Sequence, residues 1–278
     1  MTVLSELVTQ LFSAPVLLAA MIAVAGIEVL LPLHARRREN HAHLVPNLTL
    51  TLVTFATNAL LASLLVALFA ALATAQIGLL HWLPPLGPLA RTALVVLVLD
   101  LAFYAFHLSS HKVPAFWRFH RVHHSDPALD VSTTFRQHPG EAVIRNAFLA
   151  AFGAALGAPP AAYAVYRSLS ALVAVLEHAN FRLPARLDDA LSWVVTWPNV
   201  HKVHHSREQR FTDSNYGNLF SWWDRLFATF TPARCGAQVA YGLDGTDDAE
   251  TQTTAGLLAL PFRDTVGARW RRRRHTMA

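Results

Sequence analysis

Charged residues are scarce in this sequence of 278 residues. Asp, Glu, Lys and Arg together make up 15% of it, against about 25% in ordinary soluble domains. None of the four occurs in the ranges 40–90 and 146–166, while hydrophobic residues make up 53% of the chain. Such a composition is wrong for a soluble domain of this size and indicates a membrane protein.

Cysteine is nearly absent as well, since Cys235 is the only one. A single cysteine excludes an intrachain disulfide and a cysteine-based zinc site, and it agrees with a site that faces a reducing cytoplasm. The net charge of +5 is concentrated in the arginine runs 36–38 and 271–274. Beside apolar segments, such runs are typical of membrane topology and of contact with anionic headgroups, so we expect no nucleic-acid partner.

Three apolar stretches are long enough to cross a hydrocarbon core of about 30 Å. We expect spans at about 14–33, 47–73 and 89–110, with an interfacial turn between the second and the third. Glu28 lies near the end of the first span and is expected to reach the membrane interface. Because the arginines at 36–38 follow this span, the positive-inside rule puts that end in the cytoplasm and the N-terminus outside.

Two further apolar stretches, 146–157 and 161–176, are each short for a full crossing. With Pro159-Pro160 between them, they predict a helical hairpin that enters the membrane from the inside, or else two tilted spans. Both arrangements return the chain to the cytoplasm. Met1–Ser13 has no basic n-region, so a cleaved signal peptide is not expected. The predicted fold class is all-α, a polytopic helical membrane protein with a cytoplasmic His-rich catalytic cap.

Histidine is abundant, with fifteen in the chain. Eight of them fall in two runs, HLSSHKVPAFWRFHRVHH at 107–124 and HKVHH at 201–205. The spacing i, i+3, i+4 places side chains on one face of a helix. Two HxxHH patterns arise by chance in about one such sequence in a thousand, so we interpret them as functional.

Neutral imidazole is the commonest protein ligand for metals. A tetrahedral zinc takes four ligands and a catalytic zinc three plus water, so nine or ten histidines are too many for one ion and suit two. A nitrogen-rich pair of metals at a membrane surface suits oxygen activation by iron better than hydrolysis. The histidines at 34, 41, 43, 81 and 275 are expected at the surface. The candidate metal ligands are His107, His111, His120, His123, His124, His138, His178, His201, His204 and His205.

Metal-bound histidines almost always donate their second N–H to an acceptor. Asp100 lies seven residues before His107, two turns away on the same helical face, and an acid at that membrane depth is a functional candidate. Any such residue could instead cap a helix or be satisfied inside the bundle. The other candidate acceptors are Glu141, Glu177, Asn180, Asp213, Asn215 and Asp224.

These motifs together resemble the fatty acid hydroxylase / sterol desaturase superfamily over about residues 100–230. The resemblance rests on HLSSH (107–111), HRVHH (120–124), RQHPGE (136–141), EHAN (177–180), HKVHH (201–205) and TDSNYGNLFSWWDRLFATF (212–230). It implies an integral membrane enzyme whose histidines hold a non-haem di-iron centre and which oxidises lipids with O2 and an external electron donor. Two positions depart from the family pattern. Ala228 stands where glycine is usual, and Ala174 stands where some fatty acyl 2-hydroxylases carry another histidine.

We therefore expect N-terminal transmembrane helices at 1–90, a catalytic region at 91–232 and a cytoplasmic C-terminal tail at 233–278. The predicted activity is O2-dependent hydroxylation of a fatty acyl, sterol-like or other apolar lipid at two irons, on the cytoplasmic side of a bacterial plasma membrane. A lipid desaturase, or a metal transporter or metal-binding membrane protein, is the alternative. HPGE at 138–141 resembles the cytochrome b5 haem motif without a soluble domain around it. Electrons would thus come from a separate ferredoxin- or cytochrome b5-type donor with its reductase.

Overall fold

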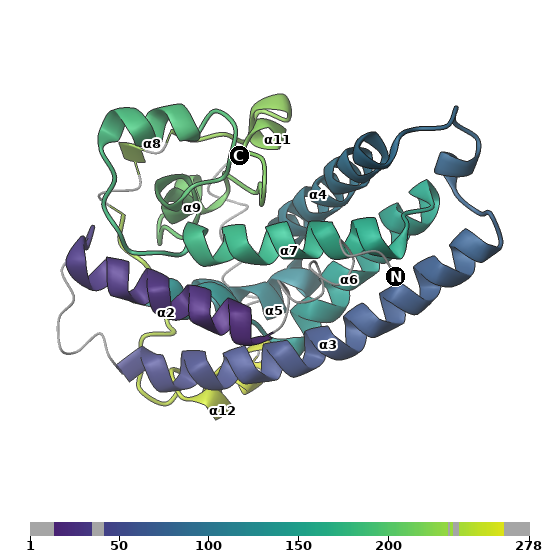
Figure 1. The fold of residues 1–278 in the computed structure, drawn as a ribbon. Helices are drawn as coiled ribbons and strands as arrows, with labels where there is room; N and C mark the ends of the chain where they lie inside the picture. The colour runs from purple at the N-terminus through teal and green to yellow at the C-terminus, as the bar shows by residue number, and fades with distance from the viewer. Residues whose placement is uncertain (1–13, 35–41, 233, 236–238, 264–278) are drawn as a thin grey trace, which may run out of the picture.

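The computed structural model describes residues 14–34, 42–232, 234–235 and 239–263, and within these ranges the protein is all-helical, as predicted (Figure 1). Two isolated bridges are the only β pairing in the described ranges. The α-helices are α2 (Ala14–Leu30), α3 (Leu44–Thr74), α4 (Pro88–Lys112), α5 (Pro114–His124), α6 (Pro139–Leu156), α7 (Pro160–Glu177), α8 (Ala185–Leu191), α9 (Pro198–His204), α10 (Gln209–Thr212), α11 (Trp222–Leu226) and α12 (Thr254–Ala259). The short 3-10 helices are η2 (Leu79–His81), η3 (Val131–Phe135) and η5 (Leu260–Phe262).

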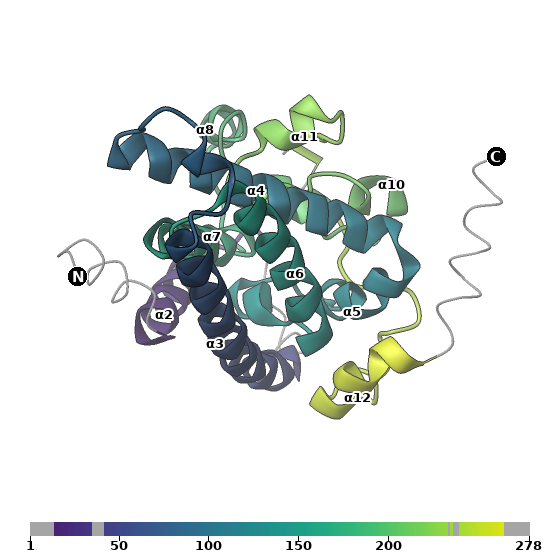
Figure 2. The ribbon, with the colours of Figure 1, turned by 90° about the vertical axis from the view of Figure 1, so that its right-hand side faces the viewer.

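Four long helices form the frame of the molecule. α4 packs against α6 and α7, and α3 packs against α6, so that α6 lies between α3 and α4 (Figure 2). All four helices contribute to one buried core, which includes Phe69, Leu99, Leu149 and Tyr163. Each such buried side chain stabilises the packing by about 1.5–3 kcal/mol. The frame is therefore held mainly by apolar contact.

Prolines and one glycine set the helix ends. Five helices (α4, α5, α6, α7 and α9) carry proline in the first two positions, where its missing N–H breaks no helical bond. α6 ends at Gly157, whose φ of 77° lies in the left-handed region that glycine adopts freely. α7 then begins at Pro160, so α6 and α7 follow each other at the two predicted apolar stretches, and both pack on α4.

Two described segments are long and apolar enough to cross a membrane, Leu44–His81 with a mean hydropathy of 2.2 and Pro88–Lys112 with 1.9. They contain the second and third predicted spans. Only 11% of the most apolar part of Leu44–His81 is buried within the protein, and soluble proteins rarely expose apolar surface of this extent. The first predicted span is shorter than expected. Its helix, α2, has 17 residues and is about 26 Å long.

The expectation that Glu28 reaches the membrane interface is wrong. Its side chain is fully buried, because α2 packs against α7 and η3. Its Oε1 accepts hydrogen bonds from the backbone N–H groups of Val131 (2.8 Å) and Asn180 (2.7 Å). Glu28 thus ties α2 to η3 and to the segment after α7.

His43, expected at the surface, is buried as well. Its Nδ1 lies 3.0 Å from a carboxylate oxygen of Asp126, and its Nε2 lies 3.6 Å from Asp130. Burial opposes the charged form, but the two carboxylates outweigh it and raise the pKa of His43 to about 9. His43 therefore carries a charge at neutral pH and joins the start of α3 to the segment between α5 and η3.

Part of the predicted C-terminal tail packs on the frame. Leu257 and Leu260 form a small buried cluster with Leu50 of α3 and Val122 of α5. Several predicted features lie outside the described residues. They are the N-terminal segment 1–13, the arginine runs at 36–38 and 271–274, the histidines at 41 and 275, and the rest of the C-terminal range 264–278.

Candidate metal centre

Nine of the ten predicted ligands meet in two adjoining groups in the interior. Group A consists of His107, His111, His120, His124 and His204, and group B of His123, His178, His201 and His205. Within each group the ring nitrogens lie within 4.8 Å of one another, and every member is buried. The groups adjoin, since the rings of His120 and His123 have centroids 5.6 Å apart.

Each HxxHH motif supplies ligands to both groups. In α5, His120 and His124 join group A while His123 joins group B. In the second motif the assignment is reversed. His204, at i+3, joins group A, whereas His201 and His205, at i and i+4, join group B. At 3.6 residues per turn, positions i and i+4 differ by about 40°, whereas i+3 and i+4 differ by about 100°. The i+3 imidazole therefore turns toward the other group.

The spacing of the ring nitrogens fits shared metal ions. In group A, Nε2 of His120 lies 3.1 Å from Nε2 of His107 and from Nε2 of His124. In group B, Nε2 of His178 lies 3.0 Å from Nε2 of His123. Two nitrogens bound at right angles, each about 2.1 Å from one ion, would stand about 3.0 Å apart.

Unpaired and neutral ring nitrogens agree with metal binding. Nε2 of His111 and of His204 is buried without a hydrogen-bond partner in the described part of the chain. Leaving such an atom unpaired costs about 1–3 kcal/mol, which a bound ion would offset. Burial lowers the pKa of His178 to about 4 and that of His204 to about 3. Both rings are therefore neutral at pH 7, the form that binds metals.

Backbone carbonyls orient two ligands of group A. Nδ1 of His107 lies 2.9 Å from the carbonyl oxygen of Tyr216, and Nδ1 of His204 lies 2.7 Å from that of Ser214. A carbonyl can only accept, so Nδ1 carries the proton and Nε2 presents its lone pair to the group. No sequence motif indicates which carbonyl does this.

Two of the predicted acidic acceptors lie beside group A. Oε1 of Glu141 is 3.2 Å from Nδ1 of His120, and Oδ1 of Asp213 is 3.6 Å from Nδ1 of His111. The second distance is longer than a hydrogen bond, and Asp213 also pairs with Lys112 at 2.9 Å. Group A therefore has carboxylates on two sides.

Asp224 and Asn215, also predicted as acceptors, hold the loop rather than a ligand. Asp224 accepts hydrogen bonds from the backbone N–H groups of Tyr216 (2.7 Å) and Gly217 (2.8 Å). Asn215 has a φ of 55° and donates to the carbonyl of Val200 at 2.9 Å. Both residues thus act on group A indirectly, by placing the carbonyl of Tyr216.

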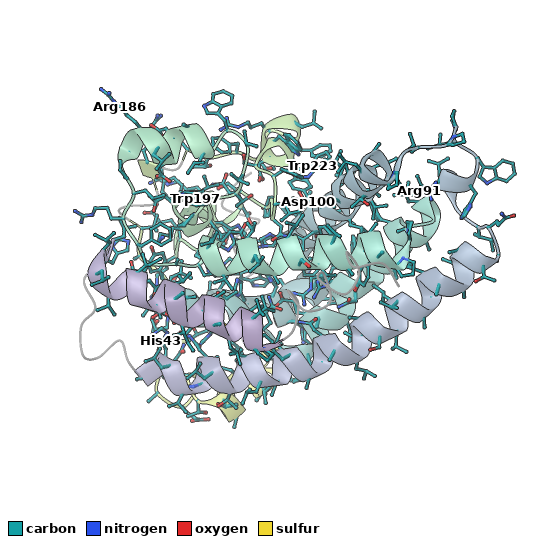
Figure 3. The ribbon with its side chains drawn as sticks, in the orientation of Figure 1. His43, Arg91, Asp100, Arg186, Trp197 and Trp223 are labelled. Atoms are coloured by element: carbon teal, nitrogen blue, oxygen red, sulfur yellow. The ribbon has the colours of Figure 1, made fainter. Side chains whose placement is uncertain are left out.

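Asp100 does not accept a hydrogen bond from an imidazole, contrary to the prediction. It accepts from the backbone N–H of Leu219 (3.0 Å) and from the indole N–H of Trp223 (2.9 Å), and Figure 3 labels Asp100 and Trp223 close together. The carbonyl of Tyr216 takes the place that was expected for Asp100 beside His107. Asp100 therefore anchors α4 to the loop before α11.

Glu177 and Asn180, the remaining predicted acceptors, differ in their surroundings. Asn180 bonds to the backbone of His34 through both ends of its amide, at 3.0 and 2.9 Å, and so lies away from the ligands. Glu177 is buried in the pocket wall. Nδ1 of His178 lies 2.8 Å from the carbonyl of Ala174 in the preceding helical turn.

His138, the tenth predicted ligand, lies outside both groups. Its Nδ1 accepts a hydrogen bond from the backbone N–H of Gly140 (2.9 Å) and so caps α6. Its ring packs against Phe119 and Phe262, with centroids 5.1 and 5.9 Å away. A helix cap of this kind satisfies the ring nitrogen without a metal, which corrects the prediction.

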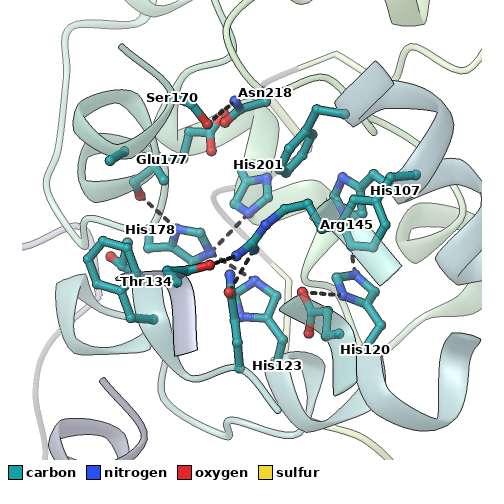
Figure 4. Close-up of a pocket in the computed structure, with 18 of the residues that line it drawn as sticks. His107, His120, His123, Thr134, Arg145, Ser170, Glu177, His178, His201 and Asn218 are labelled. Carbon is teal, nitrogen blue, oxygen red and sulfur yellow. Dashed lines mark hydrogen bonds and ion pairs between the residues drawn. The ribbon is translucent and has the colours of Figure 1, made fainter. Parts of the chain in front are cut away.

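Both groups line one pocket (Figure 4). Phe103, Phe106 and Phe135 form much of its apolar wall. The histidines that line it are His107, His120, His123, His178 and His201.

The polar residues of this pocket were missed from the sequence. They include Asn58, Gln137, Arg145, Arg167 and Asn218. Gln137 and Asn218 lie within motifs quoted for the family resemblance, whereas no motif marks Asn58 or the two arginines. For the arginines a signal was present. The two arginines stand directly before and after the uncharged range 146–166.

The fold and the site together define a helical protein with a candidate two-metal centre built from histidines. Residues 92–229, from α4 to the end of the loop after α11, match the model of the fatty acid hydroxylase family. The chain belongs to the fatty acid hydroxylase / sterol desaturase superfamily, which confirms the resemblance found in the sequence.

Several curated proteins are similar to this region. The alkylglycerol monooxygenases of Caenorhabditis elegans and Homo sapiens are 33% and 31% identical over 146 and 144 residues; each match covers 52% of this chain and 28% or 31% of the relative. The ornithine lipid hydroxylase OlsE of Rhizobium tropici is 30% identical over 155 residues, 54% of this chain and 45% of the relative. The matches thus span less than half of these relatives. No solved structure matches the chain.

Proposed function

We propose that this protein is an O2-dependent lipid hydroxylase with one iron in each histidine group. The observation that carries this proposal is the pair of adjoining groups that open on one apolar pocket. The names of the similar proteins, monooxygenases and lipid hydroxylases, support the reaction. Bound irons would supply the activation of O2 and the oxidant that attacks an unreactive C–H bond.

The chain's own residues would hold the ligands and shape the pocket. The carbonyls of Tyr216 and Ser214 fix the protonated nitrogens of two ligands of group A, so that their lone pairs face inward. Phe103 and Phe106 would exclude water and keep an apolar chain against the histidines.

The proposal includes the arrangement in a membrane. Leu44–His81 and Pro88–Lys112 would cross it, the α6–α7 hairpin would enter from the cytoplasmic side, and the histidines would face the cytoplasm. His107 and His111 lie in the last two turns of α4, and the other grouped histidines come after it in the chain. A separate ferredoxin- or cytochrome b5-type donor would approach on this side. The plasma membrane of a bacterium would suit this arrangement, because its inner face borders the reducing cytoplasm in which iron would be loaded.

Metal analysis and isotope labelling test this function. The purified protein should hold two irons per chain, and cells that make it under 18O2 should contain a lipid with one added labelled oxygen. The variant His123→Ala should abolish that product, while His81→Ala, an exposed histidine of η2, should leave it unchanged. A product that has lost two hydrogens without label would favour the desaturase, and zinc without a labelled product would contradict the proposal.

A further inference from the structure

Two arginines give the pocket a positive charge that the histidine groups do not use. Arg145 of α6 and Arg167 of α7 line the same pocket as five of the histidines, and Figure 4 shows the Arg145 side chain extending among them. Arg145 is buried and Arg167 is half-buried. Within the described residues, no carboxylate lies within ion-pair distance of either guanidinium.

Arg145 is only partly satisfied by its neighbours. Its two terminal nitrogens donate to neutral amide oxygens, of Gln137 at 2.7 Å and of Asn58 at 2.9 Å. Its Nε–H is buried and has no acceptor in the described part of the chain. Its guanidinium is charged at neutral pH, with Arg167 and the carboxylate of Glu141 as nearby charges. Because no carboxylate pairs with it directly, an anion in the pocket would offset the cost of burying this charge.

Arg167 has an even freer guanidinium. No hydrogen bond or ion pair joins it to another described residue, and it is the one basic residue of α7. Two carboxyl groups, Glu141 and Glu177, also line the pocket, but neither forms an ion pair with Arg145 or Arg167 in the described structure, and Glu141 lies beside His120. Metal ions in the two groups would add further positive charge to the same space.

We propose that Arg145 and Arg167 bind the anionic headgroup of the lipid substrate, a carboxylate or a phosphate, while the phenylalanine wall of the pocket holds its chain. The planar guanidinium group matches the geometry of both oxyanions and pairs with them through two parallel hydrogen bonds. This inference rests on the proposed function, because it names the class of lipid that the same site would take. Neutral lipids of equal chain length would lack the partner that the two arginines need.

Equilibrium binding to the full chain in neutral detergent tests the inference without catalysis. The probes are radiolabelled palmitate, palmitoyl lysophosphatidate and the uncharged methyl palmitate. Charge-assisted hydrogen bonds should make an anionic probe bind about 10-fold to 100-fold more tightly than the ester. Whichever anion binds more tightly identifies the headgroup as carboxylate or phosphate.

Variants assign the preference to the arginines. Arg167→Gln breaks no hydrogen bond or ion pair of the described structure and should reduce the preference for the anion over the ester, with Arg145 left to supply the remainder. Arg167→Lys should keep more of the preference, because it keeps the charge without the planar fork. The matched control is Arg186→Gln, since Arg186 is exposed on α8 and points away from the body of the protein (Figure 3); it should bind like the wild type.

Two results would overturn the inference, namely equal binding of acid and ester by the wild type, or an unchanged preference in Arg167→Gln. The first comparison needs no variant, so it stands even if a substitution impairs folding. Failure of the proposed function is a separate result. In that case the anion preference and its reduction in Arg167→Gln would persist, but no labelled oxygen would enter the bound lipid.

Discussion

The two histidine groups differ in how firmly the surrounding chain holds them. Group A has two backbone carbonyls and two carboxylates beside its ring nitrogens. In group B, Nδ1 of His123 and of His201 is buried without a hydrogen-bond partner in the described residues, and His178 is held by a carbonyl of its own helix. Group B also has one histidine fewer.

The two groups also differ in how many of their histidines line the pocket. Three of the four histidines of group B line the pocket, against two of the five in group A. A metal with more ligands and fixed ring orientations is held rigidly, whereas fewer ligands leave an open position for a reactant. In the proposed enzyme, group A would therefore hold its metal more rigidly, and group B would present its metal to the pocket.

Removal of one ligand from each group should have the largest effect. His123→Ala leaves three histidines in group B, and we expect iron to fall from two to about one per chain, with loss of hydroxylation. His111→Ala leaves four in group A, and most of the iron should remain. Metal analysis of both purified variants measures this. Equal losses of iron in the two variants would show that the two groups bind iron equally strongly.

Acid should destabilise the metal-free protein. The pKa of His178 is about 4 and that of His204 about 3 in the folded protein, both below the unfolded value of about 6.5. The unfolded chain therefore binds more protons below pH 6.5. Stability is complete above that pH and falls toward pH 4 by up to about 1.4 kcal/mol per pH unit for each such histidine.

Melting temperatures of the metal-free protein at pH 7.5 and 5.5 measure this loss. His178→Gln removes one such histidine from group B and His204→Gln one from group A, so each variant should show a smaller drop than the wild type. A melting temperature that is independent of pH would show that the rings are not held neutral.

A smaller effect is expected from the carboxylate beside group A. Glu141→Gln removes the charge near Nδ1 of His120 and should weaken metal binding in group A about 10-fold to 100-fold, while group B keeps its affinity. Competition with a chelator measures the two affinities. Glu208→Gln is the control, because its carboxylate pairs with Arg210 at the surface. If Glu141→Gln weakened metal binding equally in both groups, this carboxylate would not support group A alone.

The smallest effect is expected at Ala228, which stands where the family usually has glycine. Its φ of 58° is left-handed, which costs an L-residue about 1–2 kcal/mol, so Ala228→Gly should raise the melting temperature. The next residue, Thr229, donates to Asp224 at 2.7 Å, and this segment supports group A. Gln76→Gly, at a φ of 54° in the turn after α3, should stabilise similarly without changing metal affinity. A lower melting temperature of Ala228→Gly would show that the left-handed conformation does not strain Ala228.

Local patterns in the sequence predicted the long helices and all nine histidines of the two groups. Apolar runs bounded by proline gave α3, α4, α6 and α7, and the HxxHH spacing placed imidazoles together on α5 and α9. The division of each motif between two groups could not be predicted, because it depends on how α5 and α9 meet. His138 was misassigned because its position before Pro139 also suits a helix cap.

Polar residues within apolar helices were the least predictable part of the site. Asp100 was predicted to be functional and Glu28 to reach the membrane interface, but both accept hydrogen bonds from backbone N–H groups of segments about 100 residues or more away. Sequence spacing does not reveal such partners. Arg145 and Arg167 carried no motif, and only the packing of α6 against α4 and of α4 against α7 shows that both line one pocket.

The division of ligands between motifs has a consequence for biosynthesis. Neither group is complete until His201–His205 has left the ribosome, about eighty residues after the first HxxHH motif. At about 5–20 residues per second, five imidazoles therefore wait for roughly 4–16 seconds without their partners. During that interval the nascent chain offers an incomplete nitrogen site to whichever metal is most available, so the identity of the first ion is decided by cellular supply before the final geometry exists.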